Sequence, residues 1–450
     1  MSDKTGLIFF PAFDWAISPT HPEREERLLY TRDQIFEEGI MDLPRIQEYK
    51  PRLATFRDIA RTHFCVPRVR DQITEAHLVA AGAALVIADA VMTGEVRNGF
   101  ALVRPPGHHA MRVVHGNRGF CNINNEAIMV DYLRKKYGLK RIAIIDTDVH
   151  HGDGTQDIFY HDPEVLFVSF HQDGRTLYPG SGFTNESGGP TALGRTLNIP
   201  LPPGTTDEGL HYVLDNLILP VLEDFRPDLV INSAGQDNHF TDPLANMKVT
   251  AQGYAKLNEK LKPDIAVLEG GYAIETALPY VNMGIILAMA GMDYSNVVEP
   301  DYAPGMFTLS ADKKARIEEV VSELSDLWER RDSNDLDVLR AKNGFFQRQK
   351  NVFYDTDGIN EYQTEKLRLC PDCGGYLSIA SQAFHHNGVQ HNVLCLSIPF
   401  NGCEECREEA YAEYETSVSR KAHDYVYFQD RVGDTYRGYE RERDREWEEE

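Results

Sequence analysis

Short apolar runs alternate with longer amphipathic segments between residues 5 and 289. The apolar runs predict buried β-strands at residues 5–10, 100–103, 142–146, 165–170, 228–232 and 264–268. Segments with apolar residues at helical spacing predict helices at 24–35, 74–92, 124–137, 207–225, 251–261 and 275–289. Residues 173–203 are rich in glycine and proline, and we expect a loop there. The alternation predicts an α/β fold with a mainly parallel central sheet sandwiched by helices.

The strand predicted at 142–146 runs into a loop rich in aspartate, histidine and glycine, which ends at Gly154. Because side chains alternate along a strand, we expect Asp146, Asp148 and His150 to project to the same side at its end. Two carboxylates and an imidazole there indicate a divalent-metal site, since open α/β sheets bind ligands beyond the carboxyl ends of their strands. A capped Asp- and Gly-rich turn is the alternative that this motif alone leaves open.

The composition narrows the class of protein. A length of 450 residues favours one large domain with an appendage, or two domains, and 42% hydrophobic residues are typical of a globular protein. The net charge of −24 argues against a general nucleic-acid partner. The N-terminal apolar run is too short for a signal peptide, and the longest later one, 281–292, is interrupted by Asn282 and glycines. We therefore expect a cytoplasmic protein without membrane association.

The strand and helix rhythm is lost after residue 300. Residues 311–331 predict a charged amphipathic helix, whose apolar face either packs on the preceding domain or contacts a partner. We interpret residues 301–365 as a helical extension and linker. Residues 411–450 are expected to be a charged tail, ending in a solvated helix or disordered segment at 440–450.

Five of the seven cysteines lie in the last fifth of the chain, which is no disulfide framework. Cys370, Cys373, Cys403 and Cys406 form two C-x₂-C pairs, a spacing that predicts a closed Cys₄ zinc ribbon at residues 366–410 with a structural Zn²⁺. Unrelated surface thiols are the alternative. His385, His386 and His391 are alternative ligands, and Cys395 has no assigned role. Such a ribbon has several uses, including docking a partner protein or holding a homo-oligomer together.

Six motifs occur in order along residues 104–272: RPPGHHA at 104–110, GFC at 119–121, DTDVHHGDG at 146–154, YPG at 178–180, GQD at 235–237 with Asp242-Pro243, and EGGY at 269–272. Together they resemble the zinc-dependent histone deacetylase family. The resemblance implies an arginase-like fold and a deacetylase-like catalytic domain over residues 1–300. It also implies hydrolysis of an amide bond, with release of an amine and a short carboxylate.

The resemblance assigns a role to each reactive side chain. Catalytic Zn²⁺ would be held by Asp148, His150 and Asp237, leaving a position open for water and substrate. His109 would be the general base and then the acid for the departing amine, with His108 as its electrostatic neighbour. Asp146 would orient His108, and Asp153 would orient His109. Tyr272 would donate a hydroxyl to the oxyanion.

The resemblance also implies a substrate tunnel and a second cation. Gly119, Phe120 and Tyr178 match the walls of an acyl-lysine tunnel. A site for a monovalent cation, K⁺, is implied at Asp146, Asp148, His150, Ser169 and Phe170, partly through backbone carbonyls. Tyr178 replaces a phenylalanine that is usual in many relatives, so the preferred acyl group is left open.

The substrate implied is acyl-lysine in a protein or peptide. Polyamine-specialised relatives carry a glutamate seven residues after the third metal ligand, where this chain has Leu244. Glu269 is shared with some polyamine enzymes and keeps an acetylpolyamine substrate as the alternative. Arg112, His115 and Arg118 make the loop before Phe120 basic, and they either meet an acidic substrate or partner at the rim or are simply solvated. A non-catalytic metal-bound scaffold is a third hypothesis, against which the intact set of reactive residues argues.

Overall fold

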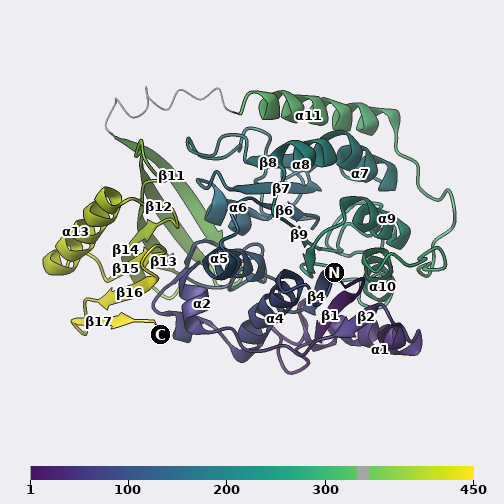
Figure 1. The fold of residues 1–450 in the computed structure, drawn as a ribbon, viewed down its shortest axis with the longest axis horizontal. Coiled ribbons are helices and arrows are strands. Elements are labelled where there is room, and N and C mark those ends of the chain that lie inside the picture. The colour runs from purple at the N-terminus through teal and green to yellow at the C-terminus, as the bar shows by residue number, and fades with distance from the viewer. Residues whose placement is uncertain (1, 332–343, 450) are drawn as a thin grey trace.

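The computed structural model describes residues 2–331 and 344–449 (Figure 1). Within these residues the six predicted apolar runs and two further strands form a central sheet of eight strands, in which every neighbouring pair is parallel. In spatial order the strands are β2 (Ile46–Glu48), β1 (Thr5–Phe10), β4 (Asn98–Val103), β10 (Ile265–Val267), β9 (Leu229–Ser233), β6 (Ile142–Asp146), β7 (Val165–Gln172) and β8 (Thr196–Leu201). The predicted α/β class and mainly parallel sheet are confirmed.

Helices cover both faces of this sheet (Figure 1). One face packs against α1 (Leu29–Glu37), α7 (Asp207–Val213), α8 (Leu219–Phe225), α9 (Ala251–Leu261), α10 (Leu278–Met289) and α11 (Ala311–Glu329). The other packs against α2 (Phe56–Ala60), α3 (Val69–Gln72), α4 (Glu75–Met92), α5 (Asn125–Tyr137) and α6 (Asp153–Phe159). A π-type turn (Leu214–Ile218) joins α7 to α8, and short 3-10 turns lie at Glu25–Leu28 and Ile40–Asp42. Because all strands of this sheet are parallel, their carboxyl ends lie at the same end of the sheet, where the loops that follow them meet.

The amphipathic helix α11 packs on the first domain, which contains the parallel sheet. Its apolar residues Ile317, Val320 and Leu324 are buried in the same core as α7. Of the two hypotheses for this helix, packing on the domain is therefore the one that the structure shows.

One described helix, α4, is long and apolar enough to cross a membrane by length and composition alone. It lies against the central sheet, and 61% of the apolar window is buried inside the fold. Its alanines, including Ala80 and Ala84, let the helix approach the strands closely. A buried core helix passes the same test, so its composition reflects packing.

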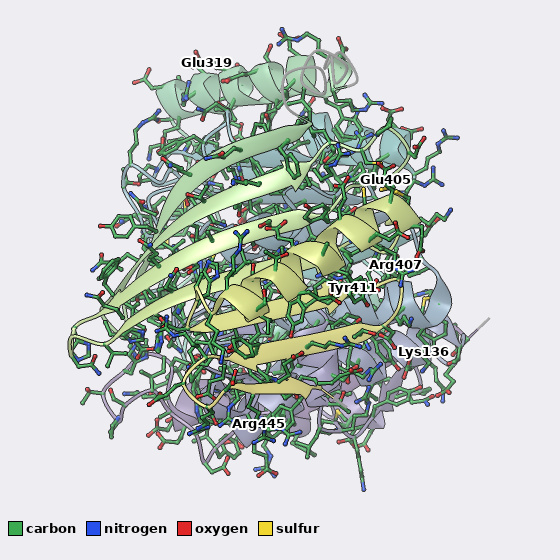
Figure 2. The ribbon with its side chains drawn as sticks, turned by 90° about the vertical axis from the view of Figure 1, so that its left-hand side faces the viewer. Lys136, Glu319, Glu405, Arg407, Tyr411 and Arg445 are labelled. Atoms are coloured by element: carbon green, nitrogen blue, oxygen red, sulfur yellow. The ribbon has the colours of Figure 1, made fainter. Side chains whose placement is uncertain are left out.

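Residues 345–448 form a second sheet of seven described strands, which follow one another in chain order. They are β11 (Phe345–Tyr354), β12 (Ile359–Arg368), β13 (Leu377–His385), β14 (Gln390–Ile398), β15 (Tyr425–Asp430), β16 (Thr435–Glu440) and β17 (Arg445–Glu448). The neighbours are antiparallel except for β14 and β15, which are parallel and joined by α13 (Glu404–Arg420). Figure 2 shows α13, with Arg407 and Tyr411, crossing the outer face of this sheet.

The two faces of the second sheet pack on different partners. Along β14, Leu394 and Leu396 are buried with Ala410 and Tyr414 of α13. The alternate residues Val393 and Cys395 are buried with Phe64, Val66 and Val113 of the first domain. Phe64 lies in β3 (Phe64–Cys65) and Val113 lies in β5 (Val113–Val114), and these two short strands pair in parallel. Val66 directly follows β3. Because successive side chains of a strand point to opposite faces, one face of the second sheet packs on α13 and the other packs on the first domain.

The expected division of the C-terminal part is wrong at three places. Residues 345–365 are strands of this sheet, not a helical linker, and residues 366–410 continue the same sheet instead of forming a separate ribbon. Residues 411–450 include most of α13 and the strands β15 to β17, so the part described is no solvated tail. At its end, Trp447 lies against Gly438, where a Cβ atom would approach the indole to 2.1 Å. Residues 332–343 of the expected linker lie outside the described residues.

A strand also replaces part of the loop expected at 173–203. The residues of β8 are all buried, although Pro200 lies among them. β8 is the last strand at one edge of the sheet, where a missing backbone N–H is tolerated. Pro200 therefore does not indicate a loop, although proline contributed to the loop expected there.

Candidate active site

Asp148, His150 and Asp237 come together beyond the ends of β6 and β9. One ligand atom from each lies within 4.8 Å of the others. Nδ1 of His150 is 3.1 Å from Oδ1 of Asp148 and 3.1 Å from Oδ2 of Asp237, and both aspartates are fully buried. Two buried carboxylates this close repel each other unless a cation lies between them.

Glycines form the cradle around these carboxylates. A Cβ atom on Gly235 would lie 2.1 Å from Oδ2 of Asp148, and one on Gly270 would lie 2.2 Å from Oδ2 of Asp237. The backbone N–H of Gly270 donates to Oδ2 of Asp148 at 2.7 Å. The residues present therefore fit a divalent metal with oxygen and nitrogen ligands.

The histidine pair lies beside this cluster, and its ring centroids are 4.1 Å apart. Nδ1 of His108 lies 3.0 Å from Oδ2 of Asp146, and Nδ1 of His109 lies 2.9 Å from Oδ1 of Asp153. Both imidazoles are buried. The structure thus brings together the two His–Asp pairs that the resemblance implies, and each pairing occupies the Nδ1 atom of the imidazole. Nε2 of His108 lies 3.8 Å from Oδ1 of Asp148.

The surroundings of the two histidines shift their pKa values in opposite directions. Burial opposes protonation of His108, but the Asp148 and Asp146 carboxylates outweigh it and raise its pKa to about 10. Burial, and then the charge of His108, lower the pKa of His109 to about 3. A cation bound at Asp148 would weaken the first effect, because it would compete for the same carboxylate. His109 is the member of the pair that the site holds neutral.

A pocket of about 230 Å³ opens over these groups. It contains every residue predicted for the tunnel, and it is lined by Pro106, His108, His109, Gly119, Phe120, Asp148, His150, Leu177, Tyr178, Leu244, Tyr272 and Asp355. Phe120 has a left-handed backbone (φ 70°) and packs edge-on against the Tyr272 ring, with centroids 5.5 Å apart. Aromatic walls over a buried polar floor are suited to an aliphatic stem that ends in a polar group.

Tyr272 is buried at the wall of this pocket. Its backbone N–H donates to Oδ2 of Asp242 at 2.7 Å, and the Arg27 guanidinium lies 4.9 Å from its ring centroid. Burial raises the pKa of its hydroxyl well above the usual value, although Arg27 opposes the shift. The hydroxyl is therefore held as a donor.

Asp355, Leu177 and Pro106 are pocket residues that sequence reasoning missed. Pro106 lies inside the RPPGHHA motif and Leu177 directly precedes the YPG motif, so both motifs offered a signal for these residues. Asp355 belongs to the turn between β11 and β12, more than eighty residues after the last motif, which ends at Tyr272. Nothing local to Asp355 in the sequence indicates this position.

The basic loop before Phe120 is not at a solvated rim. His115 and Arg118 are buried, and Nε2 of His115 lies 2.8 Å from the Ser381 hydroxyl in β13. Arg112 is half-buried and donates to the backbone carbonyl of Ile158. Both hypotheses for this loop are wrong, because the second sheet covers it.

Glu269 does not face the pocket. It is fully buried, and Oε2 accepts hydrogen bonds from the backbone N–H groups of Gly107 and His108 at 2.7 and 3.1 Å. Its carboxyl therefore supports the histidine loop from behind, which removes its value as an indication of a polyamine substrate.

Residues of the expected monovalent-cation site are adjacent in the sheet. Asp146 on β6 pairs with Ser169 on β7, and both are fully buried. Phe170 follows in the same strand, while the Ser169 hydroxyl lies 2.9 Å from Nδ1 of His171. Asp146 accepts a hydrogen bond from the backbone N–H of Asp148 through Oδ1 at 3.1 Å. The expected monovalent-cation site therefore lies directly beside the expected zinc site, and Asp148 and His150 are assigned to both.

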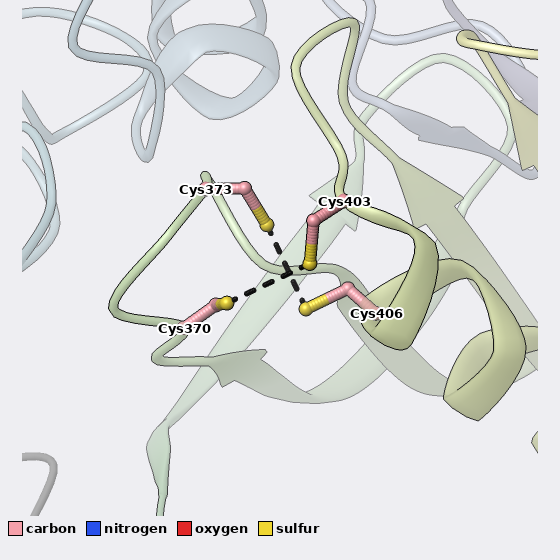
Figure 3. A group of neighbouring side chains, drawn as sticks. All are labelled: Cys370, Cys373, Cys403 and Cys406. Carbon is pink, nitrogen blue, oxygen red and sulfur yellow. Dashed lines mark hydrogen bonds between the residues drawn. The ribbon is translucent and has the colours of Figure 1, made fainter.

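The four predicted cysteines form a second cluster, in the second sheet (Figure 3). Cys370 and Cys373 follow β12, whereas Cys403 and Cys406 lie at the start of α13. The Sγ atoms of Cys370 and Cys403 are 3.8 Å apart, and those of Cys373 and Cys406 are 3.6 Å apart. A tetrahedral zinc with bonds of about 2.3 Å would separate its sulfur ligands by about 3.8 Å. His385, His386 and His391 are not part of this cluster.

Known proteins are similar to this chain in sequence and in fold. A family profile described as "Histone deacetylase domain" matches residues 21–285. A "Probable deacetylase" from Archaeoglobus fulgidus is 44% identical over 358 residues, covering 72% of this chain and 98% of that protein. "Polyamine deacetylase HDAC10" from Mus musculus is 42% identical over 219 residues, covering 46% of this chain and 32% of that protein. The crystal structure of the HDA15 HD domain superposes with a TM-score of 0.63 at 27% identity, covering 75% of this chain and 99% of that one. The chain belongs to the histone deacetylase family of metal-dependent hydrolytic deacetylases.

Proposed function

We propose that the chain is a zinc-dependent deacylase that removes acetyl or other short acyl groups from lysine side chains of proteins or peptides. The observation that carries this proposal is the convergence of four features on one pocket: the Asp148, His150 and Asp237 cluster, the histidine pair, Tyr272 and an aromatic wall. The pocket accommodates a linear stem, whose amide would then lie against the buried polar groups.

Asp148, His150 and Asp237 would hold the catalytic Zn²⁺. When bound, the metal supplies a Lewis acid that polarises the acyl carbonyl and lowers the pKa of water toward neutrality. The three protein ligands leave a coordination position open for that chemistry.

His109 is the residue best suited to move the protons. Its Nδ1 atom is engaged by Asp153, so Nε2 is available to accept a proton from the attacking water and then to give it to the departing lysine amine. His108, held by Asp146, contributes charge beside this path. The Tyr272 hydroxyl would donate a hydrogen bond to the oxyanion as the carbonyl becomes tetrahedral.

The walls of the pocket would position the substrate and exclude water. The rings of Phe120 and Tyr178 and the side chain of Leu244 offer apolar surface to the methylene stem. Removing water strengthens the hydrogen bonds that Tyr272 and His109 make at the reacting amide.

Two further ions complete the proposal. A structural Zn²⁺ at Cys370, Cys373, Cys403 and Cys406 would tie α13 to the end of β12. K⁺ at Asp146, Asp148, His150, Ser169 and Phe170 would brace the loop that carries two catalytic-metal ligands. Carboxylate, hydroxyl and carbonyl oxygens are suitable ligands for such a hard cation.

An acetylpolyamine deacetylase is the second candidate, and the similarity to the mouse polyamine deacetylase favours it. Leu244 argues against it, because an uncharged side chain lines the pocket where a polyamine-specialised relative carries a glutamate. A non-catalytic scaffold is disfavoured, because both histidines and Tyr272 line the same pocket.

A substrate panel tests the proposal. The full-length protein, loaded with Zn²⁺, is assayed with acetyl-lysine peptides, longer acyl-lysine peptides and acetylated polyamines. We expect the highest kcat/KM with an acyl-lysine peptide. A clear preference for polyamines would establish the second candidate instead, and no turnover of any substrate by the metal-loaded protein would favour the scaffold.

A further inference from the structure

The turn between β11 and β12 reaches the active site from the second sheet. At this turn Oδ1 of Asp355 accepts hydrogen bonds from the Tyr178 hydroxyl at 3.0 Å and from the Gly119 backbone N–H at 2.9 Å. Oδ2 of Asp357 accepts from the backbone N–H of Asn117 at 2.6 Å. The hairpin of β11 and β12 therefore fixes the backbone of the loop that carries the pocket residues Gly119 and Phe120.

This hairpin is packed closely on the loop. A Cβ atom on Gly116 would lie 2.3 Å from Oδ2 of Asp357 and 2.9 Å from Cδ1 of Ile359. The buried hydroxyl of Tyr354 donates to the backbone carbonyl of Val113 at 2.9 Å. Met111 is buried in a small cluster with apolar residues of the same hairpin. Several contacts thus hold the hairpin in one position relative to the loop.

Arg118 connects the hairpin to the histidine that we propose as the proton carrier. Its Nε atom donates to the backbone carbonyl of Phe353 in β11 at 3.1 Å. Its two terminal nitrogens contact the Asp153 carboxylate, at 2.7 Å to Oδ1 and 2.5 Å to Oδ2. Oδ1 of Asp153 is also the atom that lies 2.9 Å from Nδ1 of His109. The path from Phe353 to His109 is therefore an unbroken series of hydrogen bonds.

A second connection runs through Tyr178. Its hydroxyl is bonded to Asp355, while its ring stands edge-on to the His109 ring, with centroids 5.2 Å apart. The Arg118 guanidinium lies 5.5 Å from the centroid of the Tyr178 ring. The Tyr178 ring is thus held by Asp355 of the second sheet, whereas the Asp153 carboxylate is held by Arg118, which is itself bonded to Phe353 of that sheet.

We propose that the β11–β12 hairpin of the second sheet is part of the catalytic apparatus, and that Arg118 is a positioning residue through which this hairpin fixes the Asp153–His109 pair. This proposal deepens the proposed function and rests on it. Both carboxylate oxygens of Asp153 are engaged by one rigid guanidinium, so rotation of the carboxylate away from His109 would break charge-assisted hydrogen bonds. Burial alone would raise the pKa of Asp153, yet Arg118 and the contact with His109 hold it well below its usual value.

The test compares variants of the full-length, Zn²⁺-loaded protein on an acetyl-lysine peptide. Arg118→Gln should lower kcat by about 10- to 100-fold, the range for loss of a residue that orients a catalytic group, with little change in KM. Arg118→Lys should recover part of kcat, because it keeps a charge beside Asp153 but cannot contact both oxygens and Phe353 at once. Asp357→Ala changes an exposed residue outside the pocket lining, and it should lower kcat more mildly by loosening the hairpin.

The matched control is Asp424→Ala. This substitution also removes a carboxylate acceptor from a backbone N–H, that of Asn392 at 2.7 Å, but at β14 and outside the pocket lining. It should leave kcat unchanged. Melting temperature and bound zinc are measured for every variant. A folded, metal-loaded Arg118→Gln protein that retains kcat within about threefold of wild type would overturn the proposal, as would an equal loss of kcat in Asp424→Ala.

A spectroscopic readout separates this proposal from the proposed function. The imidazole N–H of His109 that is shared with Asp153 gives a low-field proton resonance, identified by its loss in His109→Asn. Arg118→Gln should shift or broaden this resonance even if no substrate of the panel is turned over. An unchanged resonance in Arg118→Gln would contradict the positioning role, whether or not the wild type is active.

Discussion

Glycines leave the space that the reactive side chains of the site occupy. Gly235 and Gly270 lie where any Cβ atom would collide with Asp148 or Asp237, and Gly119 has a φ of 52° and lies against the His109 ring. A Cβ atom there would be 2.4 Å from Cδ2 of His109. Close approach of backbone to carboxylate and imidazole is therefore what sets the geometry of the site.

At the mouth of the pocket, Leu244 is the residue that we expect to set the preference between substrates. Leu244→Glu places a carboxylate on a half-buried pocket wall, where it would attract the ammonium groups of an acetylated polyamine. We expect kcat/KM for acetylspermidine, relative to an acetyl-lysine peptide, to rise by about tenfold, equivalent to about 1.4 kcal/mol. Leu244→Gln is the uncharged control. If both variants shift the preference equally, charge is not the cause.

Local motifs are sufficient to identify most of the residues that meet at the pocket, and the roles assigned to these residues stay predictions. The His108-His109 pair, Asp146 to Asp153 and Tyr272 each sit in a short motif, and the structure brings them together. The expectation that Arg118 lies at the surface is wrong, because Arg118 is buried and bonded to Phe353, which is distant in the chain. A pattern of neighbouring residues contains no information about such a contact.

Among the elements, the strands β11 and β12 show why periodicity failed after residue 344. The inward positions of β12 include Glu361, Gln363 and Glu365, which are all buried. Glu365 lies 2.8 Å from Nζ of Lys350 on β11, so buried charge is matched by buried charge. A hydrophobicity pattern predicts strands with apolar inner faces, and it cannot detect strands whose inner faces are ion-paired.

The cysteine cluster joins two elements of the second sheet. Cys406→Ser should reduce the bound zinc from two ions per chain to one and lower the melting temperature, because a structural site needs all four sulfur ligands. Bound metal is counted by native mass spectrometry. Cys395→Ser is the control, since Cys395 is buried in β14 but is not a member of the cluster. A wild-type protein with one zinc, lost completely in Cys406→Ser, would contradict the assignment of a second site.

In the whole molecule, the second sheet and the catalytic domain are joined by buried ion pairs. Glu365 lies at this interface with Arg348 and Lys350, and Lys350 also contacts Asp157 of α6. Burial would raise the pKa of Glu365, but Lys350 and Arg348 outweigh it and hold the pKa well below its usual value. The interface is therefore expected to be sensitive to acid.

Because the pKa of Glu365 is lower in the folded than in the unfolded state, its stabilising contribution is present above the unfolded pKa of about 4.3 and is lost as the pH falls below it. We expect the free energy of unfolding to decrease steeply below about pH 4.3, and the decrease to be shallower in Glu365→Gln. Denaturant unfolding at a series of pH values measures both slopes. Glu405→Gln, in the exposed first turn of α13, is the control. Equal slopes in wild type and Glu365→Gln would exclude Glu365 as the source of the sensitivity.

The whole fold was predictable in one half and not in the other. In the catalytic domain, each predicted strand from 5–10 to 264–268 is present, because buried parallel strands are apolar on both faces and stand out in the sequence. The second sheet mixes charged and apolar inner positions and is stabilised by contacts with residues some 240 positions earlier, such as those between Tyr354 and Val113. Those contacts exist only in the folded chain.

We propose that this site hydrolyses an acyl-lysine amide with Tyr272 as the hydrogen-bond donor. The most direct test is the steady-state hydrolysis of an acetyl-lysine peptide by Zn²⁺-loaded wild type and Tyr272→Phe, with metal content and folding verified for both. We expect wild-type turnover, and a fall in kcat of about 10²- to 10³-fold in Tyr272→Phe with bound metal unchanged. Equal kcat in the two proteins would contradict the role of Tyr272, and an inactive wild type would contradict the proposed activity itself.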